Sequence, residues 1–410
     1  MEAAESVCSH ELSPGSVLDL LGRLVDKSLV IVEAGSDISE TRYRLLDTIR
    51  QYALEKLMGT GETQSVRDWH VEYFLQLAEK SEQNYYYFGS RSALWFGRLD
   101  RDLDNFRAAM EWSTNNGNAV AALRIAGSLV YFWFAHGLRA SEWNDRIQQA
   151  LSRPEGRERT LARAKALNGI GFMYWADIIS FDRRPELEEA LSIAQEFGDR
   201  WNTATALRNL GLLANIQGNY SEASSFLEQS LEIWRTIGPE GSVARANTTI
   251  FLGDVAFNQN DAESARMLYE DAAAVLREAG DMTYLAYTVR RLGQLAWRDG
   301  EFKKALAFCK ESLKLNLAAG DPRGTVACLA GFAAIATAQG QLERAAVLMA
   351  AVESQTVSLG IGLLYIDMME FDRSFDSLRA KLEGKAFGRA WAKGTSLTME
   401  EAIRLALEGS

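Results

Sequence analysis

The stretch "LGLLANIQGNYSEASSFLEQSLEIWRTIG", residues 210–238, predicts two helices joined by a tight turn at "QGNY". In its second half, small and apolar side chains recur at the three- and four-residue spacing of one helix face. These residues are Ala223, Phe226, Leu227, Ser230, Leu231 and Trp234. Before the turn, Gly211 leaves room for the two helices to cross closely, with the small Ala223 in the facing position. The stretch therefore indicates an antiparallel helical hairpin.

The same pattern recurs along the chain. It returns as "LGDVAFNQNDAESARMLYEDAAAVLREAG" at residues 252–280 and as "LGQLAWRDGEFKKALAFCKESLKLNLAAG" at residues 292–320. Looser copies begin at Ile170 and Ala330. The leading glycines Gly171, Gly211, Gly253 and Gly293 lie 40, 42 and 40 positions apart, by subtraction of their numbers. A constant period of this size predicts stacked hairpins, each of which buries the apolar face of its neighbour.

The joints between the hairpins carry their own signals. "GDR" at Gly198, "GDM" at Gly280 and "GDP" at Gly320 place a glycine where a left-handed helix cap is favoured. The aspartate that follows can accept the first free N–H groups of the next helix. At Gly238 the sequence is "GPE" instead, so we expect an altered joint there.

The Leu-Gly pair, the turn residues and the Ala and Phe/Leu positions of the second helix resemble the tetratricopeptide repeat. The period is longer than the 34 residues usual in that family, so the resemblance implies variants with long helices. Armadillo and HEAT repeats fit the length better, but they do not share the Leu-Gly pair or the turn residues. The predicted fold class is mainly α, an α-solenoid of long tetratricopeptide-like hairpins with a small α+β piece at the N-terminus.

Four parts are expected along the chain. Residues 1–60 form a partial winged-helix domain, residues 61–118 a helical connector, and residues 119–360 five to six repeat units. Residues 361–410 form a helical cap, which stacked repeats require at their ends. The cap contains "SLTMEEAIRLALEGS", where a Ser/Thr followed by Glu predicts a capped helix start.

The N-terminal part alternates between helix and strand signals. A helix pattern (Val17, Leu18, Leu21, Leu24) precedes a β-rich run over residues 29–32, and "TRYRLL" reads as a returning strand before the helix "DTIRQYALEKL". This order resembles the second half of a winged-helix domain.

The runs "LLGRLVDKSLV", "RYRLLDTIRQYALEKL", "WHVEYFLQLAE" and "LDNFRAAMEW" resemble the region after the nucleotide-binding core of bacterial STAND signalling ATPases of the NB-ARC type. The resemblance implies the domain order of that family, which is an ATPase, a winged helix and a helical-repeat sensor. The winged helix would relay the state of the sensor to the ATPase. No G-x-x-x-x-G-K-[ST] phosphate loop occurs in this sequence. ATP binding is therefore not carried over, and we expect the chain to be a fragment or a truncated gene product that lacks the ATPase.

Composition excludes several classes of protein. The 410 residues carry a formal charge of −11, whereas broad nucleic-acid binding needs a basic surface. No apolar run approaches the roughly 18 residues of a membrane span, and the first ten residues do not resemble a signal peptide. The 3 cysteines are far apart, which argues against a disulfide framework. A cytoplasmic protein is expected.

Candidate catalytic and metal sites are absent from the sequence. The 3 histidines His10, His70 and His136 form no H-E-x-x-H pair, and no G-x-S-x-G motif occurs. "CSH" at residues 8–10 has two metal-ligand types, but no further ligands are in sight, so a plain chain terminus is the better interpretation. We therefore predict no enzyme activity, no metal and no cofactor.

Binding residues are predicted from the geometry of the resembled family, in which the first helix of each unit lines a concave groove. Fixed offsets from the Leu-Gly leucine select the following residues: Trp175, Arg208, Asn209, Asn215, Asn247, Asp254, Tyr287, Arg290, Arg291, Gln294, Trp297 and Arg298.

The run from Tyr287 to Arg298 combines three arginines with two aromatics in an acidic chain. Guanidinium groups suit carboxylates or phosphates, and Tyr and Trp provide rigid contact area. The alternative is that the arginines pair with nearby Asp or Glu residues and that Trp297 packs between units. Asn209 is expected to bridge backbone between neighbouring helices.

The sequence thus favours a non-enzymatic sensor or scaffold that binds a peptide, protein or small effector in its groove, with an ATPase domain as further partner. A second hypothesis is a DNA-binding regulator that uses Arg42, Arg44, Arg50 and Lys56 of the winged helix, although neighbouring acidic residues nearly neutralise them. Assembly through the solenoid ends is a third.

Overall fold

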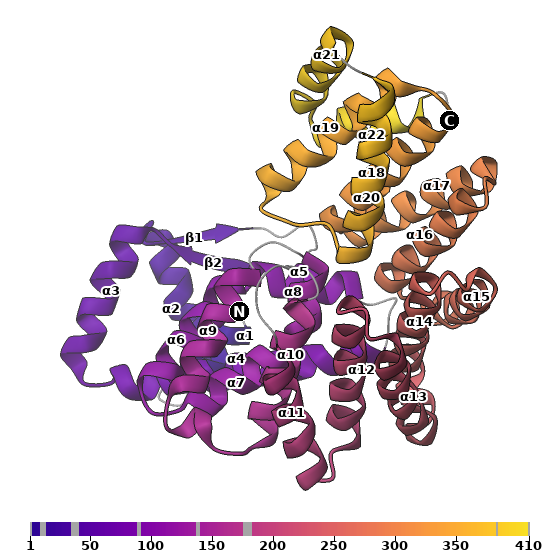
Figure 1. The fold of residues 1–410 in the computed structure, drawn as a ribbon. Helices are drawn as coiled ribbons and strands as arrows, with labels where there is room; N and C mark the ends of the chain where they lie inside the picture. The colour runs from indigo at the N-terminus through magenta and orange to yellow at the C-terminus, as the bar shows by residue number, and fades with distance from the viewer. Residues whose placement is uncertain are drawn as a thin grey trace.

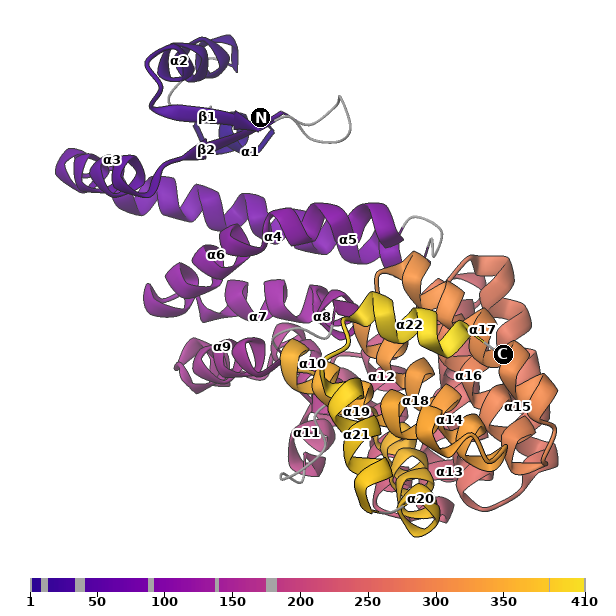
Figure 2. The same cartoon turned by 90° about the horizontal axis from the view of Figure 1, so that it is seen from above.

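The structure of the protein, a computed structural model, is almost entirely helical (Figure 1). It describes residues 2–8, 14–33, 41–87, 92–136, 140–174, 183–382 and 384–408. The described helices form a curved stack, with a small hairpin of strands near the N-terminus and a group of three helices at the C-terminal end (Figures 1 and 2).

The N-terminal part contains the predicted helix–hairpin–helix order. Its elements are α1 (Glu2–Cys8), α2 (Pro14–Asp26), β1 (Val30–Glu33), β2 (Arg42–Leu45) and α3 (Asp47–Thr60). The two strands are antiparallel, with Val30 opposite Leu45. Helix α3 has no buried residue, and large apolar side chains such as Leu18, Tyr52 and Met58 are exposed. This part therefore has little core of its own, and the winged-helix assignment stays a prediction.

The connector packs through aromatic side chains. It comprises α4 (Thr63–Tyr87), α5 (Ser92–Arg101) and α6 (Leu103–Asn115). The rings of Phe74 on α4 and Phe106 on α6 meet edge to face with centroids 5.4 Å apart, and both side chains are buried. Edge-to-face contact suits aromatic pairs, because the positive ring edge meets the negative ring face.

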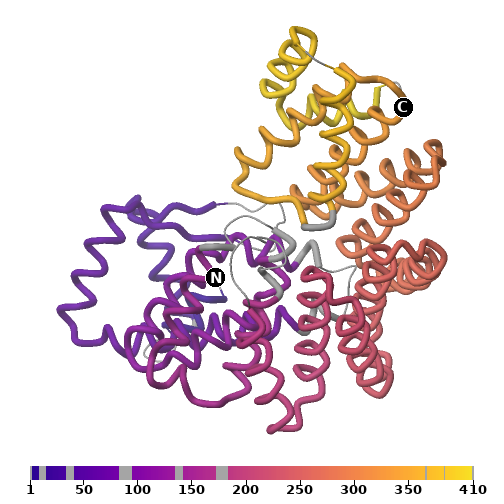
Figure 3. Tube along the Cα trace, in the orientation of Figure 1, coloured from indigo at the N-terminus to yellow at the C-terminus, as the bar shows by residue number. Residues whose placement is uncertain are grey.

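The stack of hairpins follows. A first group contains α7 (Ala119–Ser128), α8 (Val130–His136), α9 (Ala140–Ser152) and the short η2 (Glu155–Arg157). Five hairpins continue it: α10 (Leu161–Tyr174) with α11 (Arg184–Glu196), α12 (Arg200–Ile216) with α13 (Tyr220–Ile237), α14 (Ser242–Asn258) with α15 (Ala262–Ala279), α16 (Met282–Arg298) with α17 (Phe302–Ala319), and α18 (Pro322–Ala338) with α19 (Leu342–Leu359). The predicted α-solenoid is confirmed, and the tube in Figure 3 shows its curvature.

The hairpins cross closely where the sequence places glycine. A Cβ on Gly211 would lie 2.6 Å from Cγ of Leu227 and 3.1 Å from the backbone oxygen of Ala223, so the helices could not approach as they do. On the facing helix Ala223, Leu227 and Trp234 are buried. The repeated Leu-Gly pair thus marks the contact that holds each hairpin together.

The joints confirm the predicted caps. Gly280 and Gly320 end α15 and α17 with φ of 70° and 67°, in the left-handed region that glycine adopts without strain. Asp281 and Asp321 cap the next helices, since their carboxylates accept from the backbone N–H of Tyr284 and Gly324. At Gly238 a short 3-10 helix, η3 (Pro239–Gly241), replaces this arrangement, as expected for an altered joint.

The C-terminal helices leave the repeat pattern. They are α20 (Tyr365–Lys381), α21 (Gly384–Thr395) and α22 (Met399–Leu407). Helix α21 packs along α19, where the next hairpin would lie, whereas α20 packs against α18 and reaches α16 with its side chains. The end of the stack is therefore covered by α21, and α20 lies against the first helices of the last two hairpins.

The predicted cap of α22 permits a small, specific test. Thr398 accepts from the backbone N–H of Glu401, and the Glu401 carboxylate accepts from the backbone N–H of Thr398. We expect Thr398→Ala to lower the free energy of unfolding by about 1 kcal/mol, measured by urea denaturation. Thr395→Ala, which lies outside the cap, is the matched control and should change it far less.

Candidate functional site

The inner layer of the stack is formed by the first helix of each hairpin. Helices α10, α12, α14, α16 and α18 contact one another in that order, and each packs on the second helix of its own hairpin (Figure 1). All the described residues selected from the sequence lie on this inner layer. Trp175 lies outside the described residues.

One face of α16 holds α20. The guanidinium of Arg290 donates to both carboxylate oxygens of Asp367, at 3.0 and 2.8 Å, and Gln294 donates to the same carboxylate at 3.0 Å. Two helical turns after Arg290, Arg298 donates to Glu370 at 2.5 Å. The side chains of Arg290 and Asp367 are 3% and 2% exposed. The fork of an arginine matches a carboxylate in this two-bonded geometry.

A second buried network joins α14, α15 and α16. The carboxylate of Asp254 accepts from the hydroxyls of Tyr269 and Tyr287, at 2.6 and 2.7 Å, and from Nε of Arg291 at 3.0 Å. Burial raises the pKa of Asp254, and the guanidinium and the two hydroxyls oppose this shift. The guanidinium of Arg291 also lies over the ring of Phe257, 4.1 Å from its centroid. This network fixes three neighbouring helices to one another.

Amide side chains link the earlier helices. Asn209 donates to the backbone oxygen of Asn168 at 3.0 Å, and Asn168 donates to that of Asn202 at 3.2 Å. Asn209 thus bridges backbone between α12 and α10, as the sequence predicted. Arg208 points to the Asn209 side chain, with nitrogen–oxygen distances of 3.4 Å, and Asn215 accepts from Asn258 of α14 at 3.1 Å.

Some buried polar atoms of the inner layer have no hydrogen-bond partner. They include Oδ1 of Asn168, Oδ1 of Asn247 and Nη2 of Arg291, from α10, α14 and α16. An unpaired buried polar atom costs roughly 1–3 kcal/mol, so each needs an explanation. One such explanation is that these atoms form hydrogen bonds with a ligand when it is bound.

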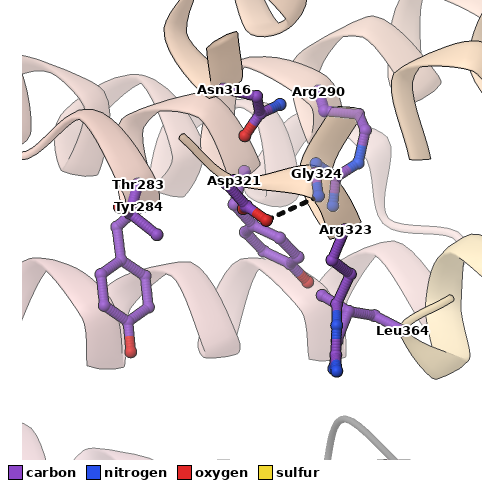
Figure 4. A pocket seen from close by; sticks show the side chains of 9 residues that line it. Thr283, Tyr284, Arg290, Asn316, Asp321, Arg323, Gly324 and Leu364 are labelled. Atoms are coloured by element: carbon purple, nitrogen blue, oxygen red, sulfur yellow. Dashed lines mark hydrogen bonds between the residues drawn. The ribbon is translucent and has the colours of Figure 1, made fainter. Parts of the chain in front are cut away.

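A small pocket opens beside this region (Figure 4). Its lining comes from the starts of α16 and α18, the end of α17 and the segment before α20: Thr283, Tyr284, Tyr287, Arg290, Asn316, Asp321, Arg323, Gly324 and Leu364. Its free volume of about 20 Å³ has room for one water molecule. Any larger ligand would have to displace side chains.

Sequence reasoning missed Asp367 and Glu370 of α20, and Asn316 and Arg323 of the pocket. The two carboxylates are three residues apart on one face of a predicted helix, which is the signal that could have found them. Arg323 directly follows Pro322 at a helix start, a position that offers no sign of burial. The arginines of α16 pair with Asp and Glu side chains of the chain itself, as the alternative interpretation of the sequence expected.

Tyr131 of α8 reaches across the curve of the stack to the joint before α16. Its hydroxyl lies 3.3 and 3.2 Å from the two carboxylate oxygens of Asp281, and its ring stacks on Tyr284 with centroids 5.6 Å apart. Residues 150 positions apart in the sequence thus close the superhelix. Burial raises the pKa of Asp281, while the N–H of Tyr284 and the Tyr131 hydroxyl oppose the shift.

This closure predicts a pH effect. Because the pKa of Asp281 in the folded state lies above its unfolded value, about 3.9, the folded state holds the proton more tightly. Its contribution to stability is complete below the unfolded pKa and is lost as the pH rises through the folded pKa. We expect Asp281→Asn to be more stable than wild type at pH 7, with a difference that shrinks towards pH 4. Melting temperatures over this range test it, and a variant less stable at pH 7 contradicts it.

Neither a cluster of metal ligands nor a membrane-spanning helix is found among the described residues. Among them, no three His, Cys, Asp or Glu side chains gather in a way that could hold a metal ion. Within the same residues, no helix is both long and apolar enough to span a membrane.

The four basic residues that the DNA-binding hypothesis names contact other residues of the chain. Arg42 pairs with Asp102 at 2.5 Å, Arg44 with Glu33 at 2.7 Å and Arg50 with Asp47 at 3.4 Å. The ammonium of Lys56 lies 5.2 Å from the centroid of the Tyr52 ring. A nucleic-acid phosphate would have to compete with these partners.

Comparisons with known proteins support the fold. The family described as the tetratricopeptide repeat matches residues 184–236 and 215–278, so the chain contains these repeats. A Mycobacterium tuberculosis protein named "Putative HTH-type transcriptional regulator" is 34% identical over 233 residues, 55% of this chain. The chain spans only 26% of that relative's length.

Two solved structures are similar. A Rap protein complexed with competence and sporulation factor has a TM-score of 0.50 and 13% identity, over 79% of this chain and 99% of its own. A STAND protein with a tetratricopeptide repeat sensor, from Pyrococcus horikoshii, has a TM-score of 0.47 and 15% identity, over 98% of this chain and 61% of its own. The Rap match shows a shared fold.

Proposed function

We propose that this chain is a non-enzymatic sensor or scaffold region that binds a peptide or protein segment in the groove of its repeats. The observation that carries the proposal is the row Arg290, Gln294 and Arg298 on α16. These side chains lie one helical turn apart and hold carboxylates that project from another helix. The inner layer thus has the spacing and chemistry to bind a polypeptide segment through its side chains.

Two further observations agree with this proposal. The unpaired atoms of Asn168 and Asn247 lie on two inner helices, and each is an acceptor that a bound segment could pair with. A protein of the same fold has been solved with a competence and sporulation factor bound, so the fold can hold a factor.

The proposed output is regulatory. The curated relatives carry the name of HTH-type regulators, and the sequence of residues 1–60 resembles a winged helix that relays the state of a sensor. A bound segment that contacts one arrangement of the repeats better than another would shift the population towards it. The N-terminal part, which has little core of its own, would transmit that shift to the ATPase domain that the resemblance implies. The engaged basic residues make direct DNA binding the weaker candidate.

A selection from a phage-displayed library of random peptides, about 12 residues long, tests the proposal. We expect enriched peptides to bind the purified chain and to lose about tenfold in affinity with Gln294→Ala or Trp297→Ala, both half-buried on the groove side. Lys304→Ala, at an exposed side chain of α17, is the matched control and should bind normally. Enriched peptides that bind all three folded variants equally, or no enrichment at all, would refute a peptide-binding groove.

A further inference from the structure

The face that α20 turns to the repeats carries several buried polar side chains beside apolar ones. Asp367, Glu370 and Ser374 are buried there, at the spacing of one helix face, and Leu378 continues the row. A helix that belongs to a core normally buries an apolar stripe. The apolar side chains Phe371 and Phe375 are only partly buried, and Phe375 meets the aromatic rings of α21. The contact of α20 with α16 therefore resembles a binding interface more than a core.

The contact between α20 and the repeats leaves some buried polar atoms without hydrogen bonds. Besides the bonds from α16, three buried atoms have no hydrogen-bond partner: Oε2 of Glu370, Oγ of Ser374 and Nε1 of Trp297. A partly open pocket of about 30 Å³ also remains between α16, α17, α18 and α20, lined by Trp297, Cys309, Ile335 and Phe371 among others. Buried ion pairs add little net stability relative to apolar contacts, because both charges lose their hydration. Unpaired buried atoms weaken the contact further.

We infer that α20 is a resident occupant of the groove, and that the row Arg290, Gln294 and Arg298 is a receptor for a helix carrying carboxylates at positions i and i+3. The inference rests on the proposed function, and it names the ligand: an acidic helical segment of a protein partner that displaces α20. Because α20 is attached on both sides by short connections, it competes at a high effective concentration. The groove is thus closed to weak ligands and open to segments that reproduce Asp367 and Glu370.

Charge complementarity favours this occupant. Two guanidinium groups and one amide of α16 face α20, and they donate to the carboxylates of Asp367 and Glu370. Arg373, on α20 itself, also contacts Glu370 at 3.2 Å. A segment that lacks the two carboxylates would leave Arg290 buried without a counter-ion and Arg298 without its carboxylate partner, which is the basis for selectivity.

The probe is a fluorescent synthetic peptide of residues 363–382, titrated by anisotropy. Asp367→Asn with Glu370→Gln in the chain removes the charges of the resident helix with little change in shape. We expect this double variant to bind the peptide about tenfold more tightly than wild type. A peptide with Asn and Gln at the two acidic positions should not bind, and adding Arg298→Gln to the double variant should weaken binding of the acidic peptide. Equal binding to wild type and to the folded double variant, or none to either, overturns the inference.

Hydrogen exchange of the wild-type chain gives a second measurement that needs no variant. We expect the amides of α20 to exchange about tenfold faster than those of α18, because α20 detaches locally. Equal protection of the two helices would overturn the inference and make α20 part of the fixed fold. If library peptides bind the groove while the α20 peptide shows no preference for the double variant, this inference fails and the proposed function stands. If neither kind of peptide binds, the proposed function fails with it.

Discussion

Arg290→Ala should destabilise the chain by about 3–5 kcal/mol, because it leaves the Asp367 carboxylate buried without its main counter-ion. Gln294 would still donate to Asp367, but a neutral amide cannot replace a guanidinium that forms two bonds. Urea unfolding at pH 7, followed by circular dichroism, measures the effect as a fall in the midpoint.

Two controls separate an unpaired charge from the loss of a contact. The double variant Arg290→Met with Asp367→Leu removes both charges, so its stability should lie within about 1 kcal/mol of wild type. Arg277→Ala breaks a pair with Glu311 whose side chains are 51% and 42% exposed, and it should change stability by less than about 0.5 kcal/mol. If Arg290→Ala proves as mild as Arg277→Ala, then α20 is loosely held and its carboxylate is hydrated after release. That outcome would contradict the stability prediction while agreeing with a detachable α20.

The hairpins and their joints could be predicted from sequence because their determinants are local. The glycine at a crossing and the residue it faces lie within one unit, as Gly211 and Ala223 do. The caps at Asp281 and Asp321 act on the next three residues. The crossing glycine and the helix caps also recur with the period of the repeat, so the same pattern predicts the same structure in several units. Asn209 was predictable for the same reason, because it bridges two neighbouring units.

The partners of the groove arginines could not be predicted, because they lie outside the period. Asp367 is 77 positions from Arg290, on a helix that matches no unit of the repeat. The charge pattern of α16 is equally compatible with a carboxylate from a ligand and with one from the same chain. The contact of Tyr131 with Asp281 spans 150 positions and depends on the curvature of the whole stack. Curvature is the sum of small rotations at each joint, and the sequence of no single hairpin specifies it.

The repeated glycines provide the second large expected effect, because equivalent positions differ in the space around them. A Cβ on Gly253 would lie 2.6 Å from Cε1 and 2.9 Å from Cδ1 of Tyr269. That ring is fully buried, and its hydroxyl donates to Asp254 and accepts from Nε of Arg291, so it cannot turn away without breaking the network of α14, α15 and α16. Overpacking at such a site costs about 1–3 kcal/mol, and the loss of hydrogen bonds adds to it.

Gly253→Ala is therefore expected to lower the free energy of unfolding by about 2 kcal/mol, although alanine is intrinsically better in a helix by about 1 kcal/mol. The matched control is Gly293→Ala, at the same position of the next unit. There the nearest atom to an added Cβ is Cβ of Phe308 at 3.1 Å, and the nearest backbone atom is the oxygen of Ala305 at 3.5 Å. The gain in helix propensity should offset this milder crowding, so Gly293→Ala should stay close to wild type in urea unfolding. Equal losses in the two variants would mean that the crossing distance of the hairpins, and not the fixed ring of Tyr269, requires glycine in each unit.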